Sequence, residues 1–198
     1  MGLEARSSPL LLSVFLVHMQ LSTHGQRRNQ LRDHAVAGTA TLVLDGADWR
    51  ATNPSQSPQT INATVPGDIL TDLEKAGLIP DPYYNVSWRD PPNVYRWANG
   101  TWTFSKTFDY GSASSSASAS SSGSGASASA SLVFDGVKMG SRITLNGAEV
   151  GITTDQFMRY SFEVAHLLKP TANVLSVSFD PNIDTGGRFM TCTGGCEY

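Results

Sequence analysis

Short runs in which apolar and polar residues alternate constrain the fold of this chain more than any other feature. From Trp102 to Phe108, aromatic residues at 102, 104 and 108 alternate with Thr and Ser, and Lys106 falls on the apolar face. The same period of two recurs over residues 160–164 and 175–179. Because successive side chains of a strand point to opposite faces, this pattern is typical of half-buried β-strands.

Turn signals separate these runs and indicate how the strands are connected. Asn146-Gly147 lies between an apolar run ending at Leu145 and a second run over 148–153, and this dipeptide is a strong signal for a two-residue hairpin. Further strands are predicted over 39–44, 61–65 and 132–134, with Trp49 as a core anchor. Several short strands joined by tight turns predict an antiparallel β-sandwich.

One short helix is predicted over residues 68–76. Asp68 occupies the N-cap position, the apolar residues 69, 70, 73 and 76 share one face, and Gly77 is placed to end the helix. The acidic residues Asp68, Asp72 and Glu74 are interpreted as the cap and a solvated face rather than as catalytic groups.

Residues 111–131 consist of 12 Ser, 6 Ala and 3 Gly. Such a composition lacks the large apolar side chains that a packed core requires. Neither flank has enough alternating strands to close a sandwich alone. We therefore expect a disordered insertion at a hairpin tip within a single domain, since loop-closure entropy grows only slowly with loop length.

The N-terminal residues 1–25 are predicted to be a signal peptide, followed by a linker over 26–37. An apolar run from Leu10 to Val17 is followed by small and polar residues, and it is too short to span a bilayer. A short buried helix and a wrongly assigned start of the chain are the alternatives. Three Asn-x-Ser/Thr sequons also favour export and N-glycosylation in a secreted, lysosomal or vacuolar protein; they begin at Asn62, Asn85 and Asn99.

Charge and cysteine content exclude several classes of partner. The formal net charge is −3 and no basic stripe is present, which argues against a nucleic-acid partner. The two cysteines, Cys192 and Cys196, could close a small loop or remain free thiols, and no nearby ligand set completes a metal site. No metal, cofactor or membrane span is predicted.

A set of motifs in fixed order carries a resemblance to a known family. They are Val65-Pro66-Gly67-Asp68-Ile69-Leu70, Asp81-Pro82-Tyr83-Tyr84, Arg96-Trp97, the run 102–108, Phe134-Asp135-Gly136-Val137, Leu145-Asn146-Gly147, the run 157–164, Leu167-Leu168-Lys169-Pro170 and Asn173-Val174-Leu175. Over residues 38–198 the chain resembles the N-terminal sugar-binding-like domain of β-mannosidases in glycoside hydrolase family 2. The resemblance implies a jelly-roll, galactose-binding-like β-sandwich, in agreement with the strand pattern.

The resemblance also implies an activity: hydrolysis of terminal β-D-mannose with retention of configuration. Retaining hydrolysis uses two carboxyl groups about 5 Å apart, one as nucleophile and one as acid/base. In the family both belong to a barrel that follows the sandwich and is absent from this chain, so no catalytic residue is assigned. The partner would be a β-mannoside glycan. A non-catalytic carbohydrate-binding module and a fragment of an exo-β-glucosaminidase are the alternatives.

The last residues of the chain are the candidate sugar contacts. The family has an arginine followed by a Gly-Trp-Asp-Trp-like segment that reaches the mannose pocket, and Arg188 and residues 194–198 are the nearest match. Glu197 corresponds to the carboxylate and Tyr198 to the second aromatic, whereas Cys196 stands where the first Trp is expected. The resemblance thus implies substrate-binding roles for Arg188, Glu197 and Tyr198. Solvated charges in a frayed tail are the alternative.

Overall fold

The computed structural model describes residues 13–14, 17–24, 39–81, 84, 101–111, 127–138, 140–180 and 182–183. The larger of its two main sheets contains, in spatial order, β10 (Ala148–Thr153), β9 (Ser141–Leu145), β12 (Asn173–Phe179), β7 (Thr103–Phe108), β4 (Gly46–Thr52) and β5 (Thr60–Val65). The smaller contains β11 (Tyr160–Glu163), β8 (Ser127–Phe134), β2 (Val17–His24) and β3 (Thr39–Val43).

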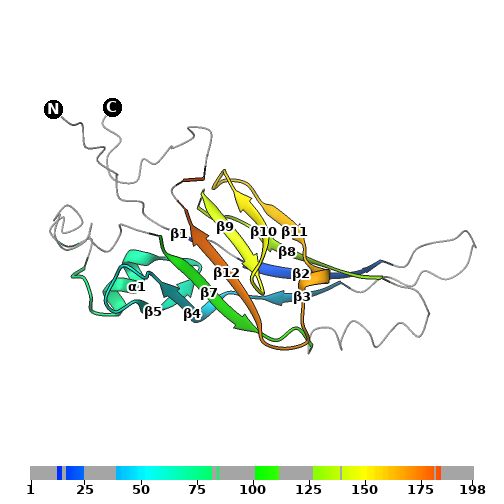
Figure 1. Cartoon of the computed structure of the whole chain (residues 1–198), viewed down its shortest axis with the longest axis horizontal. Coiled ribbons are helices and arrows are strands. Elements are labelled where there is room, and N and C mark those ends of the chain that lie inside the picture. The colour runs from blue at the N-terminus through cyan, green and yellow to red at the C-terminus, as the bar shows by residue number, and fades with distance from the viewer. Residues whose placement is uncertain are drawn as a thin grey trace, which may run out of the picture.

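Three smaller elements complete the described fold: β1 (Ser13–Val14), which pairs with β6 (Gly67–Asp68), the helix α1 (Ile69–Lys75) and the 3₁₀ turn η3 (Ala165–Leu167). All strand pairs in the described residues are antiparallel. The two main sheets lie as separate layers, with α1 beside β4 and β5 (Figure 1). The predicted antiparallel β-sandwich with one short helix is confirmed.

The alternating runs form the strands that they predicted. β12 lies at the middle of the larger sheet, where Leu175 is in register with Lys106 of β7 and with Leu145 of β9. The Asn146-Gly147 turn connects β9 to β10, and both residues have positive φ, 55° and 84°. These are the conformations that a type I′ hairpin turn requires.

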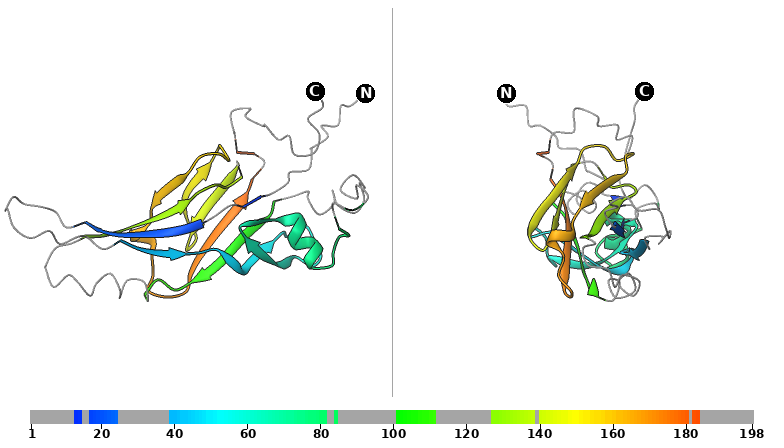
Figure 2. Two further views of the ribbon diagram at one scale, coloured as in Figure 1. Left: turned by 180° about the vertical axis from the view of Figure 1, so that it is seen from behind. Right: turned by 90° about the vertical axis from the view of Figure 1, so that its right-hand side faces the viewer.

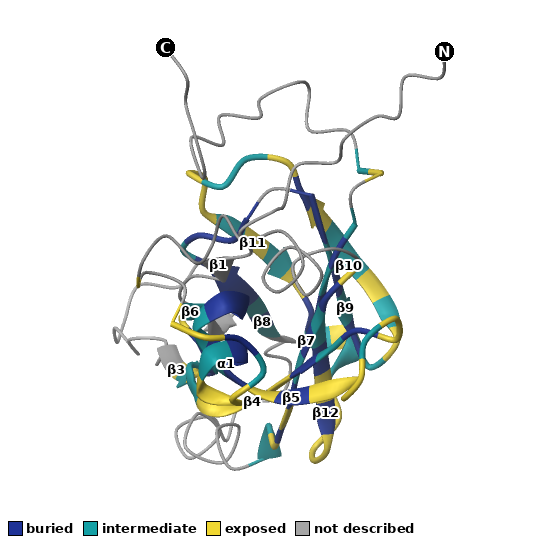
Figure 3. Cartoon of the chain, turned by 90° about the vertical axis from the view of Figure 1, so that its left-hand side faces the viewer, coloured by how far each residue is buried: buried dark blue, intermediate teal, exposed yellow. Residues whose placement is uncertain are grey.

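One hydrophobic core lies between the sheets and receives large side chains from both. The largest fully buried side chains include Trp49 and Phe104 from the larger sheet, Trp102, which directly precedes β7, and Phe134 from the smaller sheet. Figure 3 shows buried residues along β7, β9 and β12 and on α1. Trp49 is 1% exposed, and its Nε1 donates to the carbonyl oxygen of Leu44 at 2.8 Å. The predicted role of Trp49 as a core anchor is confirmed.

Lys106 lies on the apolar face of β7, as its register predicted, and is stabilised there by a carboxylate. Its side chain is 8% exposed, and Nζ donates to Asp48 Oδ1 at 2.5 Å and to the carbonyl oxygen of Asp45 at 3.2 Å. The hydrogen bond from Lys106 lowers the pKa of the Asp48 carboxyl below its ordinary value. An ammonium group that would otherwise be costly to bury is thus paired at the edge of the core.

The helix α1 begins and ends where the sequence predicted. The N-cap Asp68 accepts from the Thr71 N–H at 3.0 Å through Oδ1, and Gly77 follows the helix with φ at 71°. Its apolar residues Ile69, Leu70 and Leu73 join the core.

The interpretation of Asp72 as part of a solvated helix face was wrong. The residue is 3% exposed, and its Oδ2 accepts the backbone N–H of Thr64 in β5 at 3.2 Å. Desolvation raises the pKa of this carboxyl to about 6. The chain between β5 and α1 folds back so closely that this face of the first helical turn is covered, which the helical periodicity alone does not reveal.

The strand that was predicted to begin at Leu132 begins five residues earlier, inside the Ser/Ala/Gly tract. Residues Ser127–Ser131 belong to β8, which is in register with β2 along its whole length. Ala130 is fully buried, and its carbonyl oxygen accepts the N–H of Val164 at 2.8 Å. The end of the tract therefore contributes to the sandwich rather than to an insertion; residues 112–126 lie outside the described residues.

The segment predicted as an export signal includes residues that the structure places in a sheet. β2 lies between β8 and β3, with Met19 in register with Leu132 on one side and Leu42 on the other (Figure 2). Removal of residues 1–25 would take β1 and β2 with it. The predicted linker, residues 26–37, lies outside the described residues.

Candidate functional site

The end of the sandwich at which β12 finishes contains the last described residues before the predicted sugar contacts in the sequence. We call it the exit end and define it by residues 135–138 and 140, residues 154–159, and residues 180 and 182–183. The backbone fixes β12 here, because Phe179 donates to the carbonyl oxygen of Trp102 at 3.0 Å and Asp180 donates to that of Gly140 at 2.8 Å. The chain therefore leaves the core along a defined path.

Asp180 organises the first turn after β12. Its Oδ1 accepts the backbone N–H of Asn182 at 2.9 Å and the side-chain amide of Asn182 at 3.0 Å. The N–H of Ile183 donates to the Asp180 carbonyl oxygen at 3.2 Å. This arrangement is an Asx turn, in which an aspartate side chain replaces a backbone acceptor.

The predicted site residues lie beyond this turn. Arg188, Glu197 and Tyr198 are outside the described residues, as is the pair Cys192 and Cys196. Of the predicted glycosylation sites, Asn62 is exposed on β5, the outermost strand of the larger sheet, whereas Asn85 and Asn99 are outside the described residues.

The loop over residues 154–159 is held by one hydroxyl group. The Tyr160 hydroxyl accepts the backbone N–H groups of Thr154 at 3.0 Å and Asp155 at 2.8 Å, and it donates to the Asp155 carbonyl oxygen at 3.0 Å. Asp155 Oδ1 in turn accepts the N–H of Phe157 at 2.9 Å. The loop is therefore ordered by hydrogen bonds of its own, without depending on a partner.

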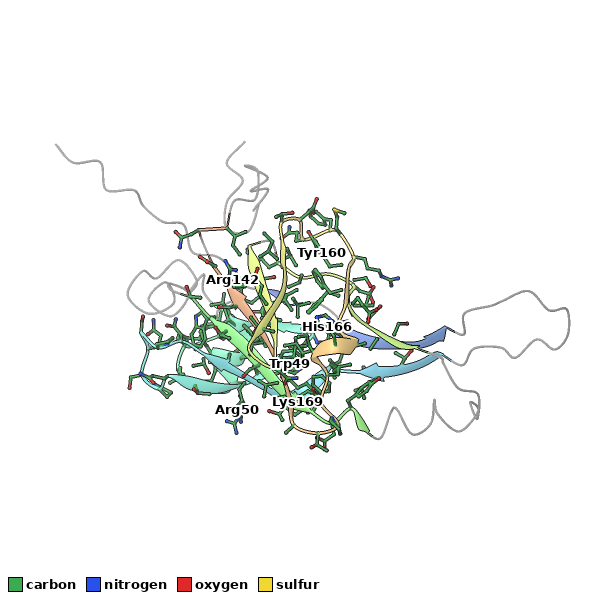
Figure 4. All side chains as sticks on the ribbon, turned by 45° about the vertical axis from the view of Figure 1, so that its right-hand side comes forward. Trp49, Arg50, Arg142, Tyr160, His166 and Lys169 are labelled. Carbon is green, nitrogen blue, oxygen red and sulfur yellow. The ribbon has the colours of Figure 1, made fainter. Side chains whose placement is uncertain are left out.

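Tyr160 is itself fixed against the core. Its ring stacks on Phe162 with the centroids 6.2 Å apart and the planes 7° apart, and Phe162 meets the edge of the buried Phe134 at 6.3 Å. A Cβ atom added at Gly151 would lie 2.4 Å from the Phe162 ring, so only glycine fits there. Figure 4 shows Tyr160 above His166 and Lys169 in that view.

Two apolar side chains are exposed on this ordered loop. Phe157 is 81% exposed and Met158 is 53% exposed. The next residue, Arg159, forms an ion pair with Asp135 across the exit end, and its side chain remains 65% exposed. The loop thus presents the apolar side chains of Phe157 and Met158 beside the Arg159 guanidinium, which is paired with Asp135 but still largely exposed.

Lys138 is a buried cation at the same end that the sequence analysis missed. The residue is 3% exposed, burial lowers the pKa of its amine, and no carboxylate among the described residues forms an ion pair with it. Beside it, Thr153 Oγ1 donates to the Lys138 carbonyl oxygen at 3.2 Å and accepts from Ser141 Oγ at 2.6 Å. No sequence pattern marks Lys138, because a single Lys between apolar residues is usually solvent-exposed.

The acids of the exit end have structural contacts. Asp135 pairs with Arg159, Asp155 caps the 154–159 loop and Asp180 forms the Asx turn. In the part of the chain that the structure describes, no three His, Cys, Asp or Glu side chains gather as they would around a metal ion. Each of these three carboxylates therefore has a role in holding the fold of the exit end.

The comparison that decides the family is the match between the sandwich and a profile described as glycosyl hydrolase 2 galactose-binding domain-like. The match covers residues 49–194, which is most of the chain and includes the whole exit end. The chain belongs to this family. The matched residues include the larger sheet from Trp49 onward, α1 and, from the smaller sheet, β8 and β11.

Proteins similar in sequence to this galactose-binding-like domain include β-mannosidases. It is 33% identical to a β-mannosidase of Capra hircus over 147 residues, which cover 72% of this chain and 15% of the relative. It is 30% identical over 155 residues to β-mannosidase A of Aspergillus aculeatus, covering 74% of this chain and 14% of the relative.

A solved structure agrees with these sequence relatives. The crystal structure of a β-D-mannosidase from Dictyoglomus thermophilum superposes with a TM-score of 0.51 at 30% identity, and the superposition covers 69% of this chain and 15% of that one. This chain thus spans about one seventh of the length of the relatives that it matches. None of the helices in the described part of this galactose-binding-like domain has the length and apolar character that a bilayer span requires.

Proposed function

We propose that this chain is the N-terminal part of a β-mannosidase-like retaining exo-glycosidase that hydrolyses terminal β-D-mannose, with its reacting carboxyl groups outside these residues. The observation that carries the proposal is the agreement of relatives and solved structure on one enzyme, each matched over about 15% of its length. The arrangement of acids agrees with it, because those at the exit end are held in structural contacts.

In this proposal the sandwich positions the chain that contacts the sugar. The Asx turn at Asp180 fixes residues 180 and 182–183, which precede the predicted sugar contacts in the sequence. Arg188 and Glu197 would hydrogen-bond sugar hydroxyl groups, and Tyr198 would stack on the apolar face of the ring.

The test is hydrolysis of an aryl β-mannoside by the polypeptide encoded by the transcript extended past Tyr198. We expect turnover with retention of configuration, and we expect Glu197→Gln to lower kcat/KM by about 10²-fold, because an unpaired sugar hydroxyl destabilises the transition state. Glu149→Gln is the matched control: Glu149 is half-exposed on β10, where it pairs with Arg142, and we expect kcat/KM to stay unchanged.

Two results would reject the proposed activity. One is a stop codon directly after Tyr198, and the other is an extended protein that fails to cleave the β-mannoside. Binding of manno-oligosaccharides without turnover, measured by isothermal titration, would instead support the carbohydrate-binding module. Preferential cleavage of an aryl β-glucosaminide would support the exo-β-glucosaminidase.

We also propose that the protein is exported and glycosylated, in a secreted, lysosomal or vacuolar location. Asn62 is exposed on β5, the edge strand of the larger sheet, so its side chain is accessible for modification. Intact mass spectrometry of the protein secreted by a eukaryotic host is expected to show an N-terminus near residue 26 and a glycan that Asn62→Gln removes.

The measured N-terminus also bears on the smaller sheet. If residues 1–25 are cleaved, β3 must pair directly with β8 for that sheet to stay continuous, because β2 is the neighbour that β3 has in the full chain. A secreted protein that retains residues 13–24 would contradict the proposed leader.

A further inference from the structure

The exit end carries two neighbouring apolar side chains that no other part of the described fold covers. Phe157 and Met158 are 81% and 53% exposed, and they are neighbours on one loop. Among the described residues, Phe157 is the most exposed of the large hydrophobic side chains. Single exposed apolar residues are ordinary, but an exposed aromatic next to an exposed methionine is the composition that protein interfaces favour.

The loop that presents this pair is ordered before any partner binds. The Tyr160 hydroxyl and the Asp155 carboxylate together satisfy three backbone N–H groups of the loop at 2.8–3.0 Å, and the Tyr160 ring stacks on Phe162, which contacts the buried Phe134. A surface that is already ordered loses little conformational entropy when it is covered. Exposure of Phe157 therefore results from a fixed backbone and not from a loose tip.

The position of the loop indicates what covers it. Residues 154–159 and residues 135–138 and 140 lie between strands of the two sheets at the end where β12 finishes, so the residues that follow Phe179 start from the same end. The relatives are several times longer than this chain, which matches about 15% of their length. The last residues that the structure describes, 182–183, belong to this end. In a longer protein, a continuing polypeptide is therefore tethered to the exit end, and tethering raises its local concentration there.

We propose that Phe157 and Met158 form an interdomain docking surface for the polypeptide that follows Tyr198, with Arg159 as a flanking cation. This inference rests on the proposed function only in requiring a longer polypeptide. Because the Arg159 guanidinium is already engaged by Asp135 yet remains 65% exposed, the covering surface is apolar at its centre and carries an acceptor at its edge.

Hydroxyl-radical footprinting with mass spectrometry tests this directly, because methionine and phenylalanine oxidise according to their exposure. The 198-residue chain is compared with the extended polypeptide, and Val174, 41% exposed near the opposite end of β12, is the internal reference. We expect oxidation at Phe157 and Met158 to fall about fivefold or more in the extended polypeptide, since the covered atoms lose contact with solvent. Oxidation of Val174 should not change.

A pair of variants separates docking from a role in folding. The double variant Phe157→Ser/Met158→Ser is expected to lower the Tm of the extended polypeptide by several degrees and to leave that of the 198-residue chain unchanged, because the loop is held by Tyr160. Val174→Ser should change neither. Equal loss in both proteins would overturn the proposal, as would unchanged oxidation of Met158 or a transcript that ends at Tyr198.

These outcomes are independent of the activity assay. Protection of Met158 in an extended polypeptide that does not hydrolyse β-mannosides would support the docking surface and reject the proposed function. Hydrolysis of the β-mannoside without protection of Met158 would support the proposed function and reject the docking surface.

Discussion

Replacing Trp49 by alanine is expected to lower the free energy of unfolding by about 3–5 kcal/mol, the usual cost of deleting a large buried aromatic side chain. Trp49 is 1% exposed in the centre of the core, and its indole N–H donates to the carbonyl oxygen of Leu44 at 2.8 Å. The substitution leaves a cavity between the sheets and a buried carbonyl oxygen without that donor. Urea unfolding followed by circular dichroism measures the loss.

Trp49→Phe is the control that separates packing from the hydrogen bond. Phenylalanine retains most of the buried apolar area but cannot donate to Leu44, so we expect a loss of about 1–2 kcal/mol. Equal losses in the two variants would show that the hydrogen bond, and not the packing, dominates. A loss below about 1 kcal/mol for Trp49→Ala would contradict the placement of this side chain in the core.

The parts of the fold that the sequence predicts are those in which one residue type determines local geometry. Asn146-Gly147 specifies a two-residue turn because both positions need positive φ, and the turn sets the first pairs of β9 and β10, before the register shifts between Glu149 and Gly151. The run 175–179 specifies β12 because its polar residues cannot share a face with its apolar residues. Even the unusual Lys106 is correctly placed, since its register is fixed by the aromatic residues on either side.

The start of β8 was not predictable in this way. Ser and Ala are both small, so their alternation produces no contrast between a core face and a solvent face. Ala130 is nevertheless buried, because the carbonyl and N–H groups of Ala130 are engaged by Val164 and Glu163. The sheet incorporates this stretch through backbone pairing, which depends little on side-chain type.

The exit end was predictable only in part. Its location after β12 follows from the order of the motifs, and the resemblance to β-mannosidases named the residues beyond it. The contacts that shape it join residues far apart in the sequence: Arg159 reaches Asp135, and Asp180 reaches Gly140. In the sequence, Tyr160 is one more aromatic residue in an alternating run. Nothing in its neighbours predicts that its hydroxyl group orders a loop.

Asp72→Asn is expected to stabilise the protein by about 1–3 kcal/mol at pH 7, because each unit of pKa shift corresponds to about 1.4 kcal/mol. Burial raises the pKa of the Asp72 carboxyl from 3.8 to about 6, so the folded state holds this proton more tightly than the unfolded chain. The cost of the charged form is absent below pH 3.8, grows as the pH rises to about 6, and is complete above that value. Asparagine remains neutral and can still accept the Thr64 N–H.

The pH profile of unfolding separates this effect from a general effect of charge. Wild-type stability should fall between about pH 4 and pH 7 relative to that of Asp72→Asn, so the two profiles converge in acid and diverge near neutrality. Lys75, whose Nζ is 3.9 Å from Asp72 Oδ1, is 60% exposed and offsets little of the desolvation. Glu74→Gln removes the same charge two residues further along the helix, where the side chain is only partly buried, and its profile should run parallel to the wild type. Parallel profiles for Asp72→Asn and wild type would show that the Asp72 carboxylate is solvated. That result would contradict the burial of Asp72 between β5 and α1.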